Sequence, residues 1–414
     1  MGLQDGSGRQ WMSLALGVAV LVGLGSGIAV ATHPGVASAQ TGVLSAAPTT
    51  EAAPGQPPTV DTPVRPVVSV TPEGTMPLNP TQPIVLKIAQ GTAKAVTVSG
   101  GDGKAVTGSL DPDGTTWTSR GQLAYATTYK LGVDTVDPSG APGHQDVTVS
   151  TVDPKAQAYP SFIPPPGQST VGVGQPIVVR FSHPVKDRAA AQKALSVTSS
   201  PAQTGSWYWL SDSEVHYRPQ AYWAAGSTLT LKAALFGVDL GGGTFGETDR
   251  TETVHIHDSW VAKADGATEQ MQIFDNGALV RSMPISLGAP GHPSHIGPHV
   301  ISDKQPSITM DSCTYGVCAG QPGYYKEQVD LDERISNDGE FVHSAPWSVN
   351  SQGGQNVSHG CVNLSPENAQ WFFDHFGIGD VVEITNSGGP PLPLADTYGD
   401  WELPWAQWLQ GSAL

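Results

Sequence analysis

A thiol, two imidazoles and a glycine are concentrated in one short part of the sequence. His343 lies in the segment Phe341–Trp347, and Cys361 lies in the segment Ser358–Asn363, with a loop rich in Gly, Gln and Asn between the two. A free thiol with a pKa of about 8.5 is only a few per cent ionised at neutral pH, so a nucleophilic cysteine needs a neighbouring base or cation. A histidine can serve as either. These residues therefore indicate covalent catalysis by Cys361 with His343 as base, against the alternative of a buried structural thiol.

The residues around the thiol are suited to stabilising negative charge. Gly360 allows a sharp backbone turn before Cys361, so that consecutive N–H groups can point at one spot and stabilise an oxyanion. A helix is predicted to begin after Ser365, which can cap it, with Pro366 at its first position. The positive end of the helix dipole would then lie close to the thiol.

This helix is the one clear amphipathic helix that the sequence predicts. Apolar residues recur at i, i+3, i+4 and i+7 before Gly377 ends the pattern, which predicts a face packed on a core. These residues are Ala369, Phe372, Phe373 and Phe376. Elsewhere the chain has 14% charged residues, 49 Gly and 35 Pro, which favours short strands and many turns. The predicted fold class is therefore mainly β, with one short helix after the nucleophile.

The part of the chain before this β-rich domain contains a repeat. The motif QPIVLKI at Gln82–Ile88 recurs as QPIVVRF at Gln175–Phe181, and each copy is followed by an alternating strand and a β-branched run. Two units of about 100 residues with period-2 strands between turns are typical of tandem immunoglobulin-like sandwiches. The run Trp207–Trp209 could be a sugar-binding platform, but a sheet face or sandwich core is the simpler interpretation.

Composition also predicts where the segments begin and end. The stretch Trp11–Ala31 is uncharged and as a helix would be about 31 Å long, which matches a bilayer core, and Ala37–Ala39 offers a cleavage site. The predicted segments are a signal peptide or membrane anchor over 1–40, a Pro-rich linker over 41–66, immunoglobulin-like domains over 67–153 and 154–257, a catalytic domain over 258–385, and a Trp-rich C-terminal extension packed on the catalytic domain over 386–414.

Charge and cysteine content restrict the partners. The net charge of -17 opposes binding to polyanions, so no nucleic-acid partner is expected. In an exported protein, Cys313 and Cys318 could form a disulfide worth about 2 kcal/mol or stay as two free thiols, and Cys361 is left over. A metal pair at these two cysteines would lack a second pair at zinc spacing.

Further histidines do not change this prediction of no metal. The group lies among Gly and Pro at irregular spacing, which is unlike a zinc site. It consists of His292, His295, His299 and Asp303.

The stretch from His343 to Asn363 resembles the signature of the L,D-transpeptidase family of bacterial cell walls. That signature is a His, about 14 to 17 residues, and then Ser/Thr-His-Gly-Cys-hydrophobic-Asn. Here 14 residues separate His343 from Ser358, and every position is filled. The order of a membrane segment, two immunoglobulin-like domains, a catalytic domain and a Trp-containing tail is similar to that of mycobacterial-type members, so the resemblance covers nearly the whole chain.

The resemblance implies a peptidoglycan cross-linking reaction without a cofactor. Cys361 would form a thioester with the diaminopimelate carbonyl of a tetrapeptide donor stem, release D-alanine, and pass the acyl group to the side-chain amine of a second stem's diaminopimelate. His343 would act as base, oriented by the backbone carbonyl of Ser344, and the N–H groups of Gly360 and Cys361 would form the oxyanion hole. Carbapenem β-lactams would be covalent inhibitors.

The resemblance also implies residues that bind substrate. Tyr325 would line the oxyanion hole, and Tyr315 and Met310 would belong to a lid, which a Cys313–Cys318 bridge would stiffen. The remaining substrate-binding residues implied are His359, Asn363 and Trp347.

The same residues are compatible with other activities. With water as acceptor the protein would be an L,D-carboxypeptidase, and with a protein amine it would ligate protein to peptidoglycan. A more distant alternative is a non-catalytic wall-binding protein built on immunoglobulin-like domains. In each case the protein is expected to be exported, either anchored to the outer face of the cytoplasmic membrane or secreted into the periplasm or cell wall.

Overall fold

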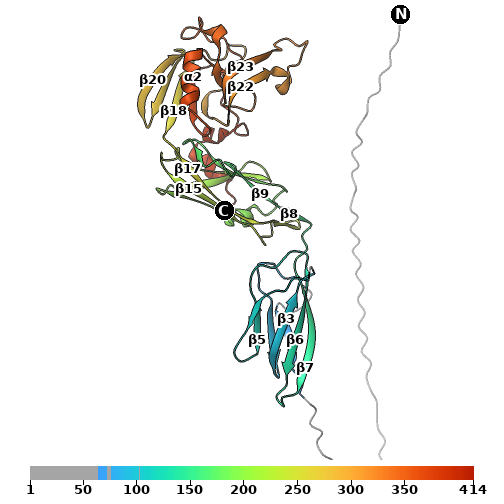
Figure 1. The fold of residues 1–414 in the computed structure, drawn as a ribbon. Coiled ribbons are helices and arrows are strands. Elements are labelled where there is room, and N and C mark those ends of the chain that lie inside the picture. Colours follow the sequence, from blue (N-terminus) through green and yellow to red (C-terminus); the bar gives the residue numbers. More distant parts are fainter. Residues whose placement is uncertain (1–63, 72–75, 102) are drawn as a thin grey trace, which may run out of the picture. The chain divides into compact units, whose positions relative to one another are not determined.

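The computed structural model describes residues 64–71, 76–101 and 103–414, in which strands greatly outnumber helices (Figure 1). The mainly β class predicted from the sequence is confirmed. The signal peptide or membrane anchor predicted over 1–40 lies outside the described residues, as does the predicted linker as far as residue 63. Within the described part, no helix is both long enough and apolar enough to span a bilayer.

The first domain is a sandwich of two antiparallel sheets, with strand orders β1-β2-β5-β4 and β3-β6-β7. Along β6, the alternate residues Tyr129, Leu131 and Val133 are buried, because successive side chains of a strand point to opposite faces. The strands are β1 (Val67–Thr71), β2 (Val85–Ala89), β3 (Thr92–Ser99), β4 (Gly108–Leu110), β5 (Thr116–Ser119), β6 (Thr128–Val136) and β7 (Pro142–Ser150).

The second domain is a sandwich of two four-stranded sheets, with orders β13-β14-β11-β9 and β10-β17-β15-β12. Trp207 and Trp209 lie in its core, which confirms the core interpretation of this run, and Tyr208 between them faces outward. Its elements are β8 (Ala156–Ala158), β9 (Pro160–Ile163), β10 (Thr170–Val171), β11 (Ile177–Phe181), α1 (Arg188–Lys193), β12 (Leu195–Ser200), β13 (Gly205–Trp209), β14 (Glu214–Pro219), β15 (Thr228–Ala234), β16 (Thr244–Gly246) and β17 (Asp249–Ile256).

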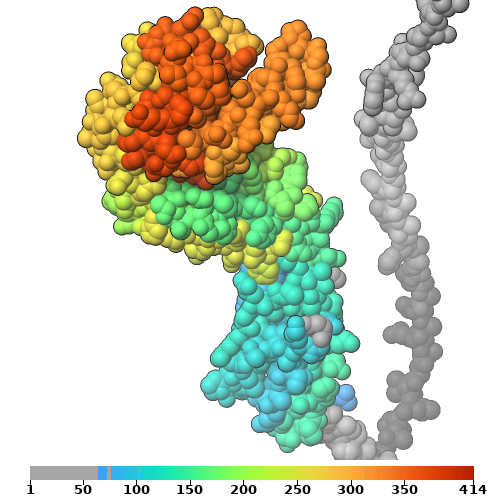
Figure 2. Space-filling view, turned by 45° about the horizontal axis from the view of Figure 1, so that its top comes forward, coloured from blue at the N-terminus to red at the C-terminus, as the bar shows by residue number. Residues whose placement is uncertain are grey.

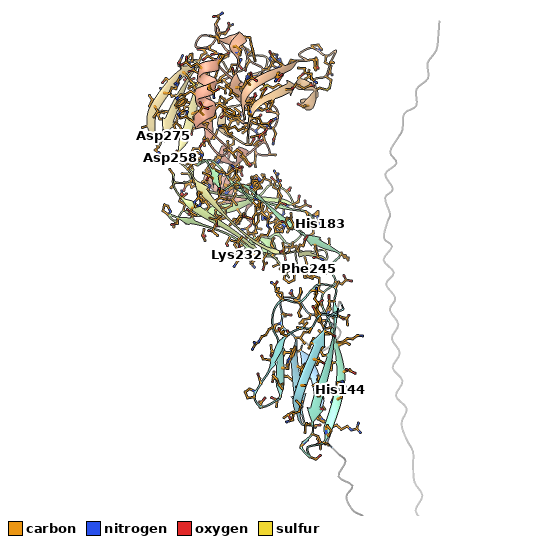
Figure 3. All side chains as sticks on the ribbon, viewed as in Figure 1. His144, His183, Lys232, Phe245, Asp258 and Asp275 are labelled. Atoms are coloured by element: carbon orange, nitrogen blue, oxygen red, sulfur yellow. A yellow bond between two sulfur atoms is a disulfide. The ribbon has the colours of Figure 1, made fainter. Side chains whose placement is uncertain are left out.

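The third domain contains two sheets, with orders β20-β19-β18-β26-β21 and β22-β23-β24-β25. The predicted boundary at Asp258, labelled in Figure 3, falls between β17 and β18. The Asn276 side chain donates a hydrogen bond to Asp258 at 3.1 Å. The strands are β18 (Trp260–Asp265), β19 (Gln270–Asp275), β20 (Ala278–Pro284), β21 (Gly297–Val300), β22 (Asp303–Asp311), β23 (Lys326–Arg334), β24 (Phe341–Ser344), β25 (Val362–Leu364) and β26 (Val381–Thr385).

Helix α2 (Pro366–His375) follows β25 and forms as the sequence predicts. The Ser365 hydroxyl accepts a hydrogen bond from Asn368 N, which caps the helix. The apolar face is buried in the core of the third domain, apart from Phe373, which is only partly buried. The helix therefore fixes the segment that carries Cys361 against this core.

The C-terminal extension packs partly on the catalytic domain, as predicted, and partly on the second domain. We expected it to lie on the catalytic domain, but Trp408 is fully buried against the second domain, where it stacks on Tyr208 and donates to Ser206 O at 2.9 Å. The buried guanidinium of Arg218 lies over the rings of three tryptophans, and aromatic rings are favourable partners for such a cation. The earlier part of the extension does contact the third domain: Pro391 pairs with Ile296, Asp396 accepts a hydrogen bond from Asn337 N, and Gly399–Glu402 packs against β21. The helical elements here are η3 (Gly399–Glu402), α3 (Trp405–Trp408) and η4 (Leu409–Gly411).

Candidate active site

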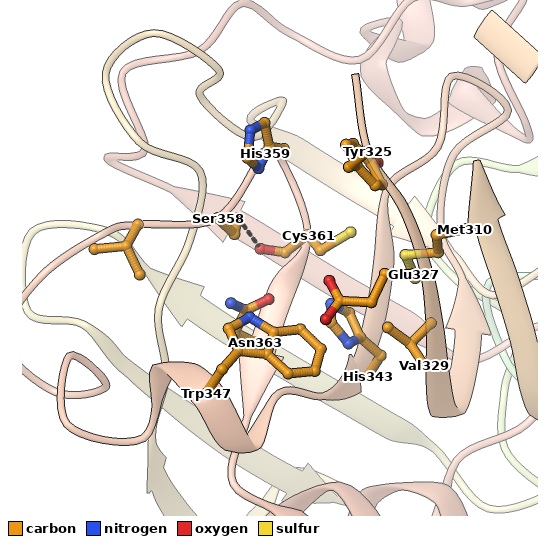
Figure 4. A pocket seen from close by; sticks show the side chains of 11 residues that line it. Met310, Tyr325, Glu327, Val329, His343, Trp347, Ser358, His359, Cys361 and Asn363 are labelled. Carbon is orange, nitrogen blue, oxygen red and sulfur yellow. Dashed lines mark hydrogen bonds between the residues drawn. The ribbon is translucent and has the colours of Figure 1, made fainter. Parts of the chain in front are cut away.

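A pocket of about 260 Å³ in the third domain brings together most of the predicted site residues (Figure 4). Strands β23, β24 and β25 supply its walls, and the segment before β25 carries the thiol. The predicted residues that line it are Cys361, His343, Tyr325, Met310, His359, Asn363 and Trp347. Of the other predicted residues, Ser344 and Gly360 adjoin it through the backbone.

His343 is held as a neutral base. It is 3% exposed on β24, and its Nδ1 lies 2.9 Å from Ser344 O. A carbonyl oxygen only accepts hydrogen bonds, so Nδ1 carries the proton and Nε2 keeps its lone pair. Burial lowers the pKa of His343 to about 4, so the ring is neutral at neutral pH. The backbone carbonyl of Ser344 therefore orients the imidazole, in the way that the resemblance implied.

The Cys361 thiol is buried and protonated. It is 6% exposed and packs with Met310, Val329 and Phe341. Burial raises the pKa of this thiol to about 12, although the Phe341 N–H favours the thiolate. The thiol donates a hydrogen bond to Gly339 O, with 3.6 Å between sulfur and oxygen. Thiol and imidazole are therefore both neutral, so the thiol proton has to leave as the thiol attacks.

The turn before the thiol is held by hydroxyl groups. Gly360 has a φ of 125°, a conformation that favours glycine, and its carbonyl accepts from Ser294 Oγ at 2.6 Å. The Gly360 N–H, which we assigned to the oxyanion hole from the sequence, instead donates to Ser358 Oγ at 3.1 Å. Ser358 Oγ also donates to Cys361 O at 2.7 Å. The Ser358 hydroxyl thus stabilises the turn. It also binds the Gly360 N–H, which is one of the two donors expected to form the oxyanion hole.

Three residues of the pocket lining were not found from the sequence, namely Glu327, Val329 and Val357. Glu327 and Val329 follow Tyr325 at steps of two on β23, so all three share one face of the strand. Strand alternation counted from Tyr325 could have identified both. Val357 lies in an irregular loop, where no periodicity applies.

Comparison with known proteins identifies the family. Residues 259–384 match the L,D-transpeptidase catalytic domain, and residues 75–239 match a bacterial Ig domain. The chain is 38% identical over 405 residues to L,D-transpeptidase 2 of Mycobacterium tuberculosis, an alignment that covers 98% of this chain and 96% of that relative. The chain belongs to the L,D-transpeptidase family. The resemblance stated from the sequence is thereby confirmed.

Other L,D-transpeptidases match parts of the chain. L,D-transpeptidase 5 of Mycobacterium tuberculosis is 33% identical, over 81% of this chain and 74% of the relative. Among solved structures, an L,D-transpeptidase in complex with imipenem is 33% identical, with a TM-score of 0.49, and covers 56% of this chain and 100% of its own. L,D-transpeptidase 3 from Mycobacterium tuberculosis in complex with a faropenem-derived adduct is 32% identical, with a TM-score of 0.47, over 54% and 97%.

The β22–β23 hairpin of this L,D-transpeptidase stands out from the rest of the domain and ends at the predicted lid (Figure 2). A disulfide joins Cys313 to Cys318 there, so of the alternatives left open by the sequence the structure has the bridge. Tyr315 ends the short turn η1 (Ser312–Tyr315), and its side chain is outside the described part of the structure.

The histidines considered as metal ligands are separated in this L,D-transpeptidase. The ring of His292 lies 4.9 Å from that of His359, whereas His295 and His299 both face the buried carboxylate of Glu340. Asp303 is not part of this group. Burial alone would raise the pKa of Glu340, but hydrogen bonds from His295 and His299 lower it to about 2. His295, Glu340 and the nearby Asp338 bring ligand atoms within 4.8 Å of one another, so these three residues could hold a metal ion, a grouping that the spacing of the histidines did not reveal.

Proposed function

We propose that Cys361 is the nucleophile and His343 the base in 3-3 cross-linking of peptidoglycan stems. The thiol attacks the diaminopimelate carbonyl of a tetrapeptide donor, so that a C–S bond forms and the C–N bond to the terminal D-alanine breaks. His343 takes the thiol proton and gives it to the leaving amine. The side-chain amine of a second diaminopimelate then forms a C–N bond with the thioester carbon while the C–S bond to Cys361 breaks, and a proton of the amine passes through His343 to the sulfur. None of these steps needs a cofactor.

The observation that carries this proposal is the orientation of His343. Its bond to Ser344 O fixes the tautomer, so that Nε2 is the basic nitrogen in the pocket that also holds the thiol. The low pKa of His343 means that the base is unprotonated at neutral pH. Ser344 is thus a positioning residue, and His343 is the group that moves protons.

Other residues receive roles by their position around the thiol. We assign oxyanion stabilisation to the Cys361 N–H and to Tyr325, because the Gly360 N–H is already bonded to Ser358. Trp347 is 54% exposed at the pocket and offers an apolar surface to a stem peptide.

The same thiol chemistry supports acylation by carbapenems. Relatives that are 33% and 32% identical were crystallised with imipenem and with a faropenem-derived adduct. We also propose that the enzyme acts outside the cytoplasmic membrane, because the uncharged stretch Trp11–Ala31 has the length of an export or anchoring segment.

The proposal is tested by mass spectrometry of products from a diaminopimelate-containing disaccharide-tetrapeptide. The full chain is compared with Cys361→Ala and with Glu367→Gln, a control on the exposed face of α2. A dimer lighter by one D-alanine, formed by the wild type and the control but not by Cys361→Ala, supports cross-linking and the nucleophile together. Accumulation of tripeptide alone indicates an L,D-carboxypeptidase, and a product only with a protein amine indicates ligation of protein to wall. If the substrate is unchanged with the wild type, the result favours the alternative of a non-catalytic wall-binding protein.

A further inference from the structure

We propose that Glu327 forms a subsite for the side-chain ammonium of the acceptor stem, a role that rests on the transpeptidation proposed above. Glu327 projects from β23 into the pocket that holds Cys361 and His343 (Figure 4). Val329 lies two residues along the same strand face and lines the same wall, and Met310 is opposite Glu327 in the β22–β23 pairing. The carboxylate is therefore carried by the wall that faces the reacting groups.

Glu327 has no partner of opposite charge within the described residues. Among the described residues that line the pocket it is the one carboxylate, and none of them is Lys or Arg. Lys326, the nearest cation along the chain, is bound to Asp311 at 3.0 Å. No hydrogen bond or ion pair joins Glu327 to another described side chain.

The two imidazoles of the pocket do not supply the missing charge. Burial lowers the pKa of His343 to about 4, and burial with the nearby His292 lowers that of His359. Both rings are therefore neutral at neutral pH. Beside Glu327 the wall is apolar, with Met310 and Val329, and Glu327 itself is exposed, so its carboxylate can meet a cation that enters from solvent.

The acceptor brings a cation of this kind. A primary amine on an alkyl chain has a pKa of about 10.4, so it arrives as an ammonium and must lose a proton before it attacks the thioester. Glu327 holds the ammonium in the pocket, and Nε2 of His343 takes the proton. The free amine then forms the C–N bond while the C–S bond breaks; His343 returns its proton to the sulfur, and the second proton of the attacking nitrogen leaves to solvent. Glu327 binds and selects in this step but transfers no proton.

The donor stem carries the same ammonium on its own diaminopimelate, so the two sources have to be separated by experiment. Acylation of Cys361 by the donor is measured first, as the rate of thioester formation by intact-mass spectrometry of the full chain. Transfer to the acceptor is measured second, as the dependence of dimer formation on acceptor concentration. Each rate is determined for the wild type, Glu327→Gln, Glu327→Asp and the control Glu367→Gln.

We expect Glu327→Gln to raise the KM for the acceptor about fivefold, the effect of losing one exposed charge pair, with thioester formation within twofold of the wild type. Glu327→Asp should recover part of this loss, and Glu367→Gln should behave as the wild type. Added salt should raise the acceptor KM of the wild type but not that of Glu327→Gln, because salt screens the lost attraction.

Two outcomes would overturn the assignment. An unchanged acceptor KM in Glu327→Gln would show that the carboxylate does not bind the acceptor. A parallel fall in thioester formation would place the ammonium on the donor instead. Absence of any thioester in the wild type would contradict the proposed function itself, and so it is distinct from both results.

Discussion

Replacing Glu340 by Gln should destabilise the turn that carries Cys361, the proposed nucleophile. The Glu340 side chain is 6% exposed and accepts hydrogen bonds from His295 N at 2.8 Å and His295 Nδ1 at 3.1 Å. His299 Nε2 lies 3.4 Å from its other oxygen. A Cβ added at Gly360 would be 3.4 Å from the Glu340 side chain, so this side chain lies directly against the turn that precedes Cys361. Glutamine has nearly the same size and shape as glutamate but carries no charge, so the substitution removes only the charge of residue 340.

The magnitude follows from the pKa of Glu340. Burial alone would raise this pKa, but hydrogen bonds from His295 and His299 lower it from 4.5 to about 2. This lowering of the pKa corresponds to about 3 kcal/mol of unfolding free energy. The folded state favours the ionised form, so this stabilisation is fully present above about pH 4.5 and is lost as the pH falls towards 2. The pKa of His295 is raised by the same hydrogen bond to Glu340, so it is not counted as a second contribution to the unfolding free energy.

Native-state hydrogen exchange is the suitable assay, because a chain of several domains has no single unfolding free energy. At pH 7 the amides of residues 358–363 should lose about 3 kcal/mol of protection in Glu340→Gln, and this loss should shrink at acid pH. Glu367→Gln removes a surface charge 3.7 Å from Arg281 and should change protection by less than about 0.5 kcal/mol. Equal protection in the two variants at pH 7 would refute the reasoning.

Three further predictions concern the base, the turn and the lid. Thioester formation should fall below about pH 4 and stay level up to neutral pH, because His343 must be unprotonated to accept the thiol proton; a pH profile with its midpoint near 7 would contradict this. Gly360→Ala should slow thioester formation about 10- to 100-fold, since alanine is strained at a φ of 125° and the turn must shift; a rate within twofold of the wild type would show that the turn tolerates a side chain. Replacing Cys313 and Cys318 together by Ser should lower protection of the hairpin tip in hydrogen exchange by about 2 kcal/mol, and carbapenem acylation of Cys361 should persist; unchanged exchange would mean that other contacts hold the tip.

The sequence predicted those parts of the site that depend on interactions between residues close together in the chain. The cap at Ser365 and the buried positions of Phe372 and Phe376 follow from helical period and local hydrogen bonding, which act over a few residues. His343 and Cys361 are 18 positions apart, but the neighbouring parallel strands β24 and β25 bring their segments together. The spacing of the motif was therefore enough to predict that the two residues share a site.

Contacts between distant segments could not be predicted in the same way. Glu340 and His295 are 45 residues apart, and Arg218 meets the carbonyl of Asp400 across 182 residues. Nothing in the local sequence around Arg218 specifies that its guanidinium will be covered by tryptophans from the end of the chain. The expected contact of the extension with the catalytic domain followed from the need to bury those tryptophans, but that need does not choose the surface that buries them.

The protonated state of Cys361 fits the proposal that it is the nucleophile of an enzyme acting outside the cytoplasmic membrane. The thiolate is the form that oxidants and disulfides attack, so a thiol with a pKa of about 12 reacts slowly while the site is empty. Cys313 and Cys318 are already paired with each other and leave Cys361 no partner within the chain. Donor binding must then draw the thiol from Gly339 O towards the imidazole of His343. Reactivity would therefore arise when the substrate is in place, and the strands that bury the thiol serve both protection and catalysis.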